Sequence, residues 1–329
     1  MIVLLALCLS FTCLTTQAQT HVFKFETSDI PSFFFKVSPD GSMLSYTIPL
    51  LGRVDAAPGE NKIINLKTGD LVKVPGPNDP VFIGDSGLMV IPGKYQTYRI
   101  YKVNDLLAGK NEVLKEIDDL IGYYQSAAVM SKRDGIYTIR IIAEYKSHEH
   151  PYIDFIYNSN LSHQDPKLLV RTNTQAFFVC PNIKLKLPML SKDGRYLGGI
   201  DGETGTSGIW RINSDMSCTK TVDLKLKVGK INFDYTNSKI TYHIYHKSGT
   251  SGVDASDAYV SRPQKDFVAD IFVLDLETLE TRRITDNLES NSLYPDFTQD
   301  GKVVFINHPH DSSKKVSFNF MSLYPVSGQ

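Results

Sequence analysis

The sequence has few of the features that usually reveal a function directly. Its formal net charge is −1, which argues against nucleic acid or an anionic membrane surface as the partner. Glycine-rich phosphate loops, a C-x-x-C-H haem motif and zinc-type cysteine pairs are absent. The GTSG segments at 205–208 and 249–252 lack the final glycine of a nucleophile elbow. These absences favour a protein that is not an enzyme and has no cofactor.

The hydrophobic run at the start of the chain is short. Residues 2–14 are almost wholly apolar but too few for a comfortable transmembrane span, and Thr16-Gln17-Ala18 offers small residues suited to signal cleavage. No lysine or arginine precedes the run. We predict that residues 1–18 are a signal peptide. Residues 19–329 would then form one periplasmic or secreted domain that is not inserted in a membrane.

Cysteine is scarce, with four residues in the chain. Cys8 and Cys13 lie in the predicted signal, so the exported chain keeps Cys180 and Cys218. Two cysteines in an exported chain favour a disulfide, and two buried free thiols are the alternative. The disulfide would close a loop of about 38 residues, and the chain-entropy model makes this worth about 4 kcal/mol.

Helical periodicity is nearly absent, and the sequence instead contains a repeat. Turns of the Asp-Gly type end at positions 41, 87, 135, 194, 238 and 301. Their intervals of about 44 to 63 residues fit four-stranded propeller blades, with insertions in the longer ones. Runs rich in β-branched and aromatic residues surround each turn, and outer strands follow, for example at 167–171. We predict an all-β fold, a six-bladed β-propeller of four-stranded blades.

The last repeat is incomplete, because few residues remain after Leu323 for a fourth strand. The segment HVFKFET at 21–27 alternates apolar and polar residues and precedes the first complete unit. We predict that this N-terminal strand pairs with the strand near 316–323. It would close the last blade and leave no open seam between the first and last blades.

Several segments resemble TolB-type, WD40-like propeller repeats. DIFVLDLET at 270–278 with TRRIT at 281–285 resembles the outer strands, and SPDG at 38–41 and YPDF at 294–297 resemble the inner ones. The resemblance implies a six-bladed periplasmic propeller without the additional α/β domain that precedes the propeller of TolB. Propellers of this type serve many roles, so the resemblance leaves the function open.

One face of the predicted propeller is the better place to look for a site. The links between second and third strands share a face with the links between blades, and they are long and polar. The insertion at 247–265 is the longest of these links. It is either functional, as a lid or a partner-binding arm, or a mobile loop. The candidate binding residues in these links are Arg53, Asp55, His148, His150, Asp201, Glu203, Asp254, Asp257, Tyr259, Arg262, His308 and His310.

Histidine pairs provide the main alternative to simple binding. His148 and His150, together with His308 and His310, could ligate a divalent metal if the pairs converged in the pore. Some propellers of TolB-like sequence resemble oligogalacturonate lyases, which hold a metal through pore histidines. Asp201 and Glu203 could bind calcium, although a polar turn is the simpler explanation.

We therefore expect an exported, monomeric propeller that binds an envelope or extracellular protein or glycan through its polar loop face. A metal-dependent, polysaccharide lyase-like enzyme is the first alternative. A Tol–Pal-like envelope partner is the second.

Overall fold

The computed structural model describes residues 21–27, 29, 35–49, 59–76, 80–83, 87–92, 98–117, 123–133, 136–145, 153–162, 176–178, 180, 183, 185–247 and 267–323. This part of the chain is nearly all β, and its one helix is the short α1 (Val103–Leu107). Within these ranges no helix has the length and apolar character needed to cross a membrane.

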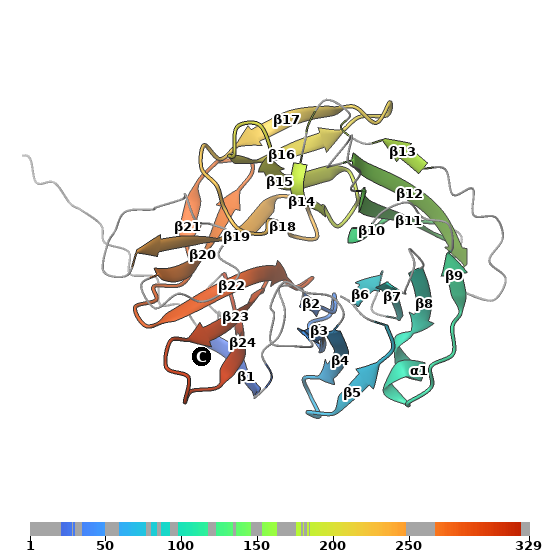
Figure 1. The fold of residues 1–329 in the computed structure, drawn as a ribbon, viewed down its shortest axis with the longest axis horizontal. Coiled ribbons are helices and arrows are strands. Elements are labelled where there is room, and N and C mark those ends of the chain that lie inside the picture. The colour runs from blue at the N-terminus through green and yellow to red at the C-terminus, as the bar shows by residue number, and fades with distance from the viewer. Residues whose placement is uncertain are drawn as a thin grey trace, which may run out of the picture.

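Four of the sheets are each a unit of four antiparallel strands in chain order, and all the sheets stand side by side around a common centre (Figure 1). The first sheet contains β2 (Lys36–Val37), β3 (Met43–Pro49), β4 (Gly59–Asn65) and β5 (Leu71–Val74). The second contains β6 (Val81–Ile83), β7 (Leu88–Pro92), β8 (Tyr98–Lys102) and β9 (Lys115–Ile117). The third contains β10 (Tyr123–Arg133), β11 (Ile136–Tyr145), β12 (Ile153–Ser162) and β13 (Ala176–Phe178). The fourth contains β14 (Leu185–Leu190), β15 (Tyr196–Asp201), β16 (Ser207–Ile212) and β17 (Cys218–Asp223).

The remaining strands form one eight-stranded sheet made of two such units. The fifth unit contains β18 (Asn232–Phe233), β19 (Lys239–Lys247), β20 (Phe267–Asp275) and β21 (Thr281–Arg283). The sixth unit contains β22 (Ser290–Phe297), β23 (Val303–Pro309), β24 (Val316–Met321) and β1 (His21–Thr27). The two units join where Ala269 of β20 pairs in parallel with Asn291 of β22.

The N-terminal strand completes the sixth unit. β1 runs antiparallel to β24, with Lys24 opposite Asn319 and Phe25 opposite Phe318 (Figure 1). The Phe23 ring packs edge-on against Phe320, with ring centroids 5.5 Å apart. The pairing predicted from the alternation at 21–27 is therefore confirmed.

Three of the predicted inner turns, at 38–41, 191–194 and 298–301, share one hydrogen-bond arrangement. Ser38 Oγ donates to Asp40 Oδ1 at 2.6 Å and accepts from the Met43 amide at 2.9 Å, while Gly41 adopts a φ of +70°. A left-handed residue is easiest to accommodate as glycine. The same pattern recurs at Ser191 with Asp193, and at Thr298 with Asp300. The aspartates of these turns therefore shape the backbone.

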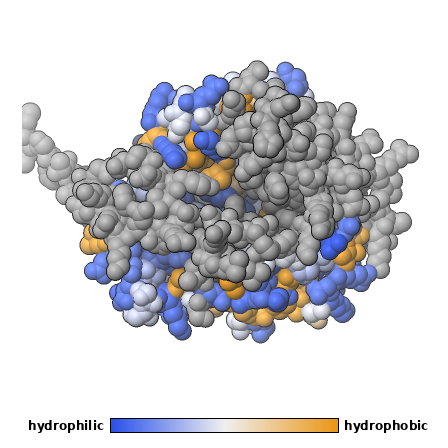
Figure 2. All heavy atoms as spheres, viewed as in Figure 1, coloured by the Kyte–Doolittle hydropathy of each residue, from blue (hydrophilic) through white to orange (hydrophobic). Residues whose placement is uncertain are grey.

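Antiparallel pairing places these turns at one end of every unit, which we call the turn face. The opposite end, which we call the link face, carries the connections between second and third strands and those between units. Figure 2 shows hydrophilic and hydrophobic residues interspersed along the lower edge of the molecule. The hydrophobic core lies between neighbouring sheets, as in the packing of Phe35 and Tyr46 of the first sheet on Phe318 of the sixth unit.

The core of the fourth sheet contains the only tryptophan of the chain. Trp210 is 1% exposed and lies in one cluster with Leu197 and Cys180, which agrees with a packing role. Cys180 and Cys218 form a disulfide with their Cα atoms 4.8 Å apart. This bond ties the segment that enters the fourth sheet to its outermost strand, β17.

Candidate functional site

Most of the candidate binding residues predicted from the sequence lie outside the described residues. These are Arg53, Asp55, His148, His150, Asp254, Asp257, Tyr259 and Arg262. The structure describes the other four, and all of them are on the link face: Asp201 and Glu203 in the fourth sheet, His308 and His310 in the sixth unit.

Asp201 shapes a turn. Its Oδ1 accepts the backbone N–H groups of Glu203 at 2.9 Å and Thr204 at 3.4 Å, and Glu203 itself is exposed. Asn65 and Asp275 make the same contacts with the amides two and three residues later, in turns between third and fourth strands. Asp201 thus belongs to a turn type that this chain uses repeatedly.

His308 and His310 lie at the end of β23, beside Asn291 of β22. Asn291 is opposite His308 in the strand pairing, and Asn291 Nδ2 lies 3.2 Å from His310 Nε2. Asn291 is fully buried, and its Oδ1 has no hydrogen-bond partner in the described part of the chain. Burial lowers the pKa of His308 to about 4, so this imidazole is neutral at pH 7. A buried acceptor therefore lies next to two imidazoles on the link face.

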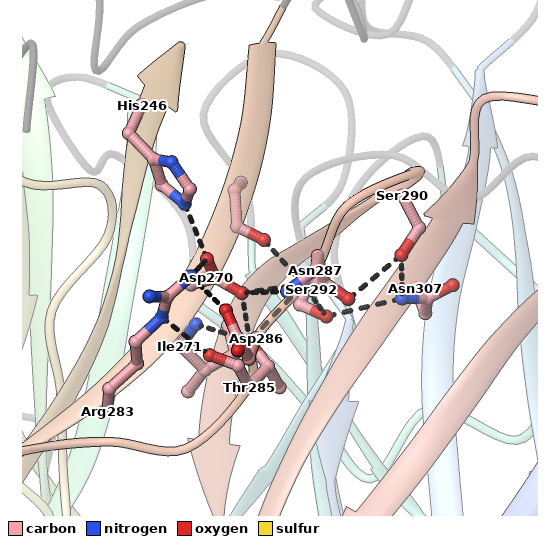
Figure 3. A network of polar contacts seen from close by, with 11 residues as sticks. His246, Asp270, Ile271, Arg283, Thr285, Asp286, Asn287, Ser290, Ser292 and Asn307 are labelled. Atoms are coloured by element: carbon pink, nitrogen blue, oxygen red, sulfur yellow. Dashed lines mark hydrogen bonds and ion pairs between the residues drawn. The ribbon is translucent and has the colours of Figure 1, made fainter. Parts of the chain in front are cut away.

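A polar network centred on Asp270 joins the fifth and sixth units at the same face (Figure 3). The carboxylate is 0% exposed, and its Oδ2 accepts from His246 Nε2 and from Arg283 Nη2 at 2.5 Å each. Its Oδ1 accepts from Thr285 Oγ1 at 2.7 Å and from both the backbone and side-chain nitrogens of Asn287 at 2.9 Å. The buried charge is thus surrounded by donors from β19, β21 and the link to β22.

Asn287 extends this network into the sixth unit. Its Nδ2 donates to Ser292 Oγ at 2.9 Å, and its Oδ1 accepts from Ser290 Oγ at 2.9 Å. Ser290 Oγ also accepts from Asn307 Nδ2 at 2.9 Å, and Asn307 directly precedes His308 (Figure 3). The network therefore connects the base of the insertion at 247–265 with the strand end that carries the two histidines.

The sequence pattern alone does not predict this network. The repeat resemblance places Asp270 in an outer strand and does not include Asn287. The available signal was an aspartate within the otherwise apolar run FVADIFV at 267–273. A charge in a buried strand is rarely tolerated without partners.

Of the four histidines predicted as metal ligands, the structure describes two, His308 and His310. Two imidazoles, His308 and His310, and one amide oxygen, that of Asn291, lie at the end of the β22–β23 pair. In the ranges that the structure describes, no three side chains of histidine, cysteine, aspartate or glutamate form a group suited to a metal.

A second buried histidine lies deeper between the same two units. His243 of β19 is 2% exposed, and its Nδ1 accepts the Tyr294 amide at 3.3 Å. The rings of Tyr245 and Tyr294 pack edge-on against it, at centroid distances of 5.4 and 5.0 Å. A Cβ at Gly229 would lie 2.0 Å from the imidazole, so only glycine fits there. Burial lowers the pKa of His243 to about 3.

This histidine is expected to make the protein less stable in mild acid. The folded pKa of about 3 lies below the ordinary value of 6.5, so the unfolded chain binds the proton more tightly. The stabilisation is complete above pH 6.5 and is lost as the pH falls towards 3. Between pH 7 and pH 5 the loss is on the order of 2 kcal/mol. Urea unfolding of the native protein and of His243→Gln at both pH values tests this, since glutamine keeps an acceptor but does not titrate. An equal loss in both proteins would contradict the prediction.

Comparisons with known proteins identify the fold. No family model and no curated protein matches the sequence. The structure is similar to a putative TolB from Agrobacterium tumefaciens, which is 14% identical, with coverage of 92% of this chain and 93% of that one and a TM-score of 0.51. It is equally similar, with a TM-score of 0.51, to the β-propeller domain of Cps50 (Swd1) from Myceliophteria thermophila. That domain is 6% identical, with 93% of this chain and 100% of the other covered.

An oligogalacturonate lyase in complex with manganese gives a TM-score of 0.45 at 13% identity, over 88% of this chain and 76% of that one. This similarity is too low to support an argument about function. The two closer structures and the sheet topology define the fold as a β-propeller. At this level of identity, they show the fold alone.

Proposed function

We propose that the chain is an exported six-bladed propeller, closed by β1, that binds an envelope or extracellular protein or glycan through its link face. The propeller fold supports a binding role, because rigid sheets of this kind commonly present ligand-binding loops. The pairing of β1 with β24 supports closure. The hydrophobic run at 2–14 supports export.

The observation that carries this proposal is the unpaired oxygen of Asn291 beside His308 and His310. An unpaired buried acceptor costs about 1–3 kcal/mol, which a ligand N–H or O–H donor would recover. His310 is partly exposed, so the cluster reaches the surface at this end. The Asp270 network holds the supporting strand ends in place, which lowers the entropy cost of binding.

The link-face cluster can be tested by quantitative pull-down from envelope extract. We expect Asn291→Ala and His310→Ala to reduce capture of the main partner about tenfold, as expected when a buried hydrogen bond to a ligand is lost. Lys302→Ala is the matched control, because Lys302 lies on the turn face and pairs only locally with Asp300. Protease or glycosidase treatment of the extract identifies the partner class. Capture that is equal for all variants would contradict the proposal.

A metal-dependent, lyase-like enzyme is the second candidate, and the same cluster favours it. The imidazoles of His308 and His310 and the Asn291 oxygen are suitable ligands for a transition metal. A bound metal would act as a Lewis acid towards an acidic polysaccharide. Metal analysis of the purified protein tests this candidate. Stoichiometric metal that disappears in His308→Gln would support it, and metal-free protein after loading with Mn²⁺ would exclude it.

A further inference from the structure

Side chains from four units meet at the turn-face end of the central region. Lys192, in the turn after β14, donates from Nζ to Asp296 Oδ1 of β22 at 2.8 Å. Lys36 of β2 approaches Asn232 of β18, with Nζ 3.5 Å from Oδ1. The first contact joins the fourth sheet to the sixth unit, and the second joins the first sheet to the fifth unit. In each pair the two units are separated by one other unit, so both contacts lie at the centre around which the units are arranged.

The repeat itself does not require a charge at these positions. β22 bulges between Leu293 and Asp296, where Tyr294 has a φ of +53°. β14 has the same irregularity, with Leu187 at a φ of +54° and the buried, apolar Met189 in place of Asp296. Equivalent positions are those at the same distance before the left-handed residue of each turn. They are Lys36 before Gly41, Met189 before Gly194, Asn232 before Asn237 and Asp296 before Gly301.

The Asp296 carboxylate is ionised, but only one of its two oxygens accepts hydrogen bonds from the described residues. Its Oδ1 accepts from Lys192 and from the Phe297 amide at 2.9 Å. Its Oδ2 is buried and has no hydrogen-bond partner in the part of the chain that the structure describes, although the residue is only 1% exposed. Burial would raise the pKa of Asp296, but the nearby charges of Lys192 and Lys36 hold it below the ordinary value. The oxygen is therefore a strong acceptor that needs a donor.

The Lys192 ammonium group can donate more hydrogen bonds than the one it gives to Asp296. An ammonium group carries three N–H donors, and one of them is used by Asp296. The Lys192 side chain is 23% exposed, and Nζ lies 5.0 Å from the centre of the partly exposed Tyr235 ring. This group and the aromatic ring are thus reachable from the turn face.

The local chemistry selects a neutral ligand group that both donates and accepts. A carboxylate anion cannot donate to Asp296 Oδ2, and an ammonium cation cannot accept from Lys192 Nζ. A hydroxyl satisfies both sides, because it donates to Oδ2 and accepts from Nζ. A neighbouring aromatic ring adds an apolar surface on which the C–H face of a sugar can pack.

We propose that this end of the ring binds a hydroxyl group of a neutral saccharide. The hydroxyl donates to Asp296 Oδ2 and accepts from Lys192 Nζ, and the sugar ring lies beside Tyr235. This site is distinct from the link-face cluster, since Asp296 and Asn291 lie at opposite ends of β22.

Ligand-observed NMR titration tests the proposal with glucose, galactose, N-acetylglucosamine and their disaccharides, and with acetate and ethylammonium as charged comparators. We expect at least one saccharide to bind the native protein. Its affinity is expected to fall about tenfold or more in Lys192→Met and in Asp296→Asn, because each removes a hydrogen bond to a charged group. Lys302→Met, a neighbouring turn-face lysine paired with Asp300, is expected to bind as the native protein does.

Thermal unfolding checks that each variant is folded. If Asp296→Asn does not fold, Lys192→Met and Tyr235→Leu carry the test, since both residues are partly exposed. Saccharide binding that these variants weaken and Lys302→Met preserves would establish the site. No binding of any saccharide, binding of acetate or ethylammonium instead, or equal binding by all variants would overturn the proposal.

Discussion

Replacing Asp270 by alanine is expected to lower the free energy of unfolding by about 3–5 kcal/mol, as for the removal of one partner from a buried ion pair. The carboxylate is fully buried and accepts from His246, Arg283, Thr285 and Asn287. Its loss leaves these donors without their acceptor and weakens the contact between the fifth unit and the sixth. Reversible denaturation in urea, followed by circular dichroism, measures the change.

Asp286→Ala is the matched control for this prediction. Asp286 pairs with the same Arg283, at 2.7 Å, but its side chain is 82% exposed. Exposed ion pairs contribute less than about 1 kcal/mol, so the control is expected to change little. Equal losses for the two variants would show that the buried network does not hold the units together.

Removing the disulfide is expected to be similarly costly. Cys180 and Cys218 are separated by 38 residues, and the double variant Cys180→Ala/Cys218→Ala should lose about 4 kcal/mol because the unfolded chain gains entropy. The bond also holds β17 against the core around Trp210. Chemical denaturation of the oxidised protein and of the double variant measures the difference.

Reduction with dithiothreitol provides an internal control for the disulfide. It should destabilise the native protein by a similar amount and leave the double variant unchanged. A native protein that is equally stable with and without the reductant would contradict the prediction.

Features with local signals could be predicted from the sequence. The turn at Ser38–Asp40 follows from short-range side-chain chemistry, and the structure repeats it in other units. The alternation at 21–27 predicts a strand, and the incomplete last repeat indicates its partner, β24. The outer strand of the third sheet is different. Residues 167–171 were predicted for it, but β13 at Ala176–Phe178 pairs with β12. Turn spacing does not fix the register after an insertion.

The candidate sites depend on distant contacts that the sequence could not specify. Asp270 and His246 are separated by the insertion at 247–265, and Lys192 and Asp296 lie in different units. In the sequence, Asp296 is notable only as part of the YPDF segment at 294–297. Its unpaired oxygen is apparent only in the structure, where Lys192 of another unit pairs with the other carboxylate oxygen. Conversely, the sequence predicts Asp201 as a binding residue because it lies in a polar link, whereas its carboxylate forms a turn in the structure.

The pairing of β1 with β24 has a consequence for how the chain folds. His21 pairs with Met321, so the last sheet requires nearly the full contour of the polypeptide. Such a contact has a high entropic cost and forms late, because it cannot form before the intervening units are compact. Until then the outer edge of β24 is unpaired and can accept β1 from another copy. High protein concentration during refolding is therefore expected to favour strand-exchanged oligomers, whereas dilution favours pairing of β1 and β24 within one chain.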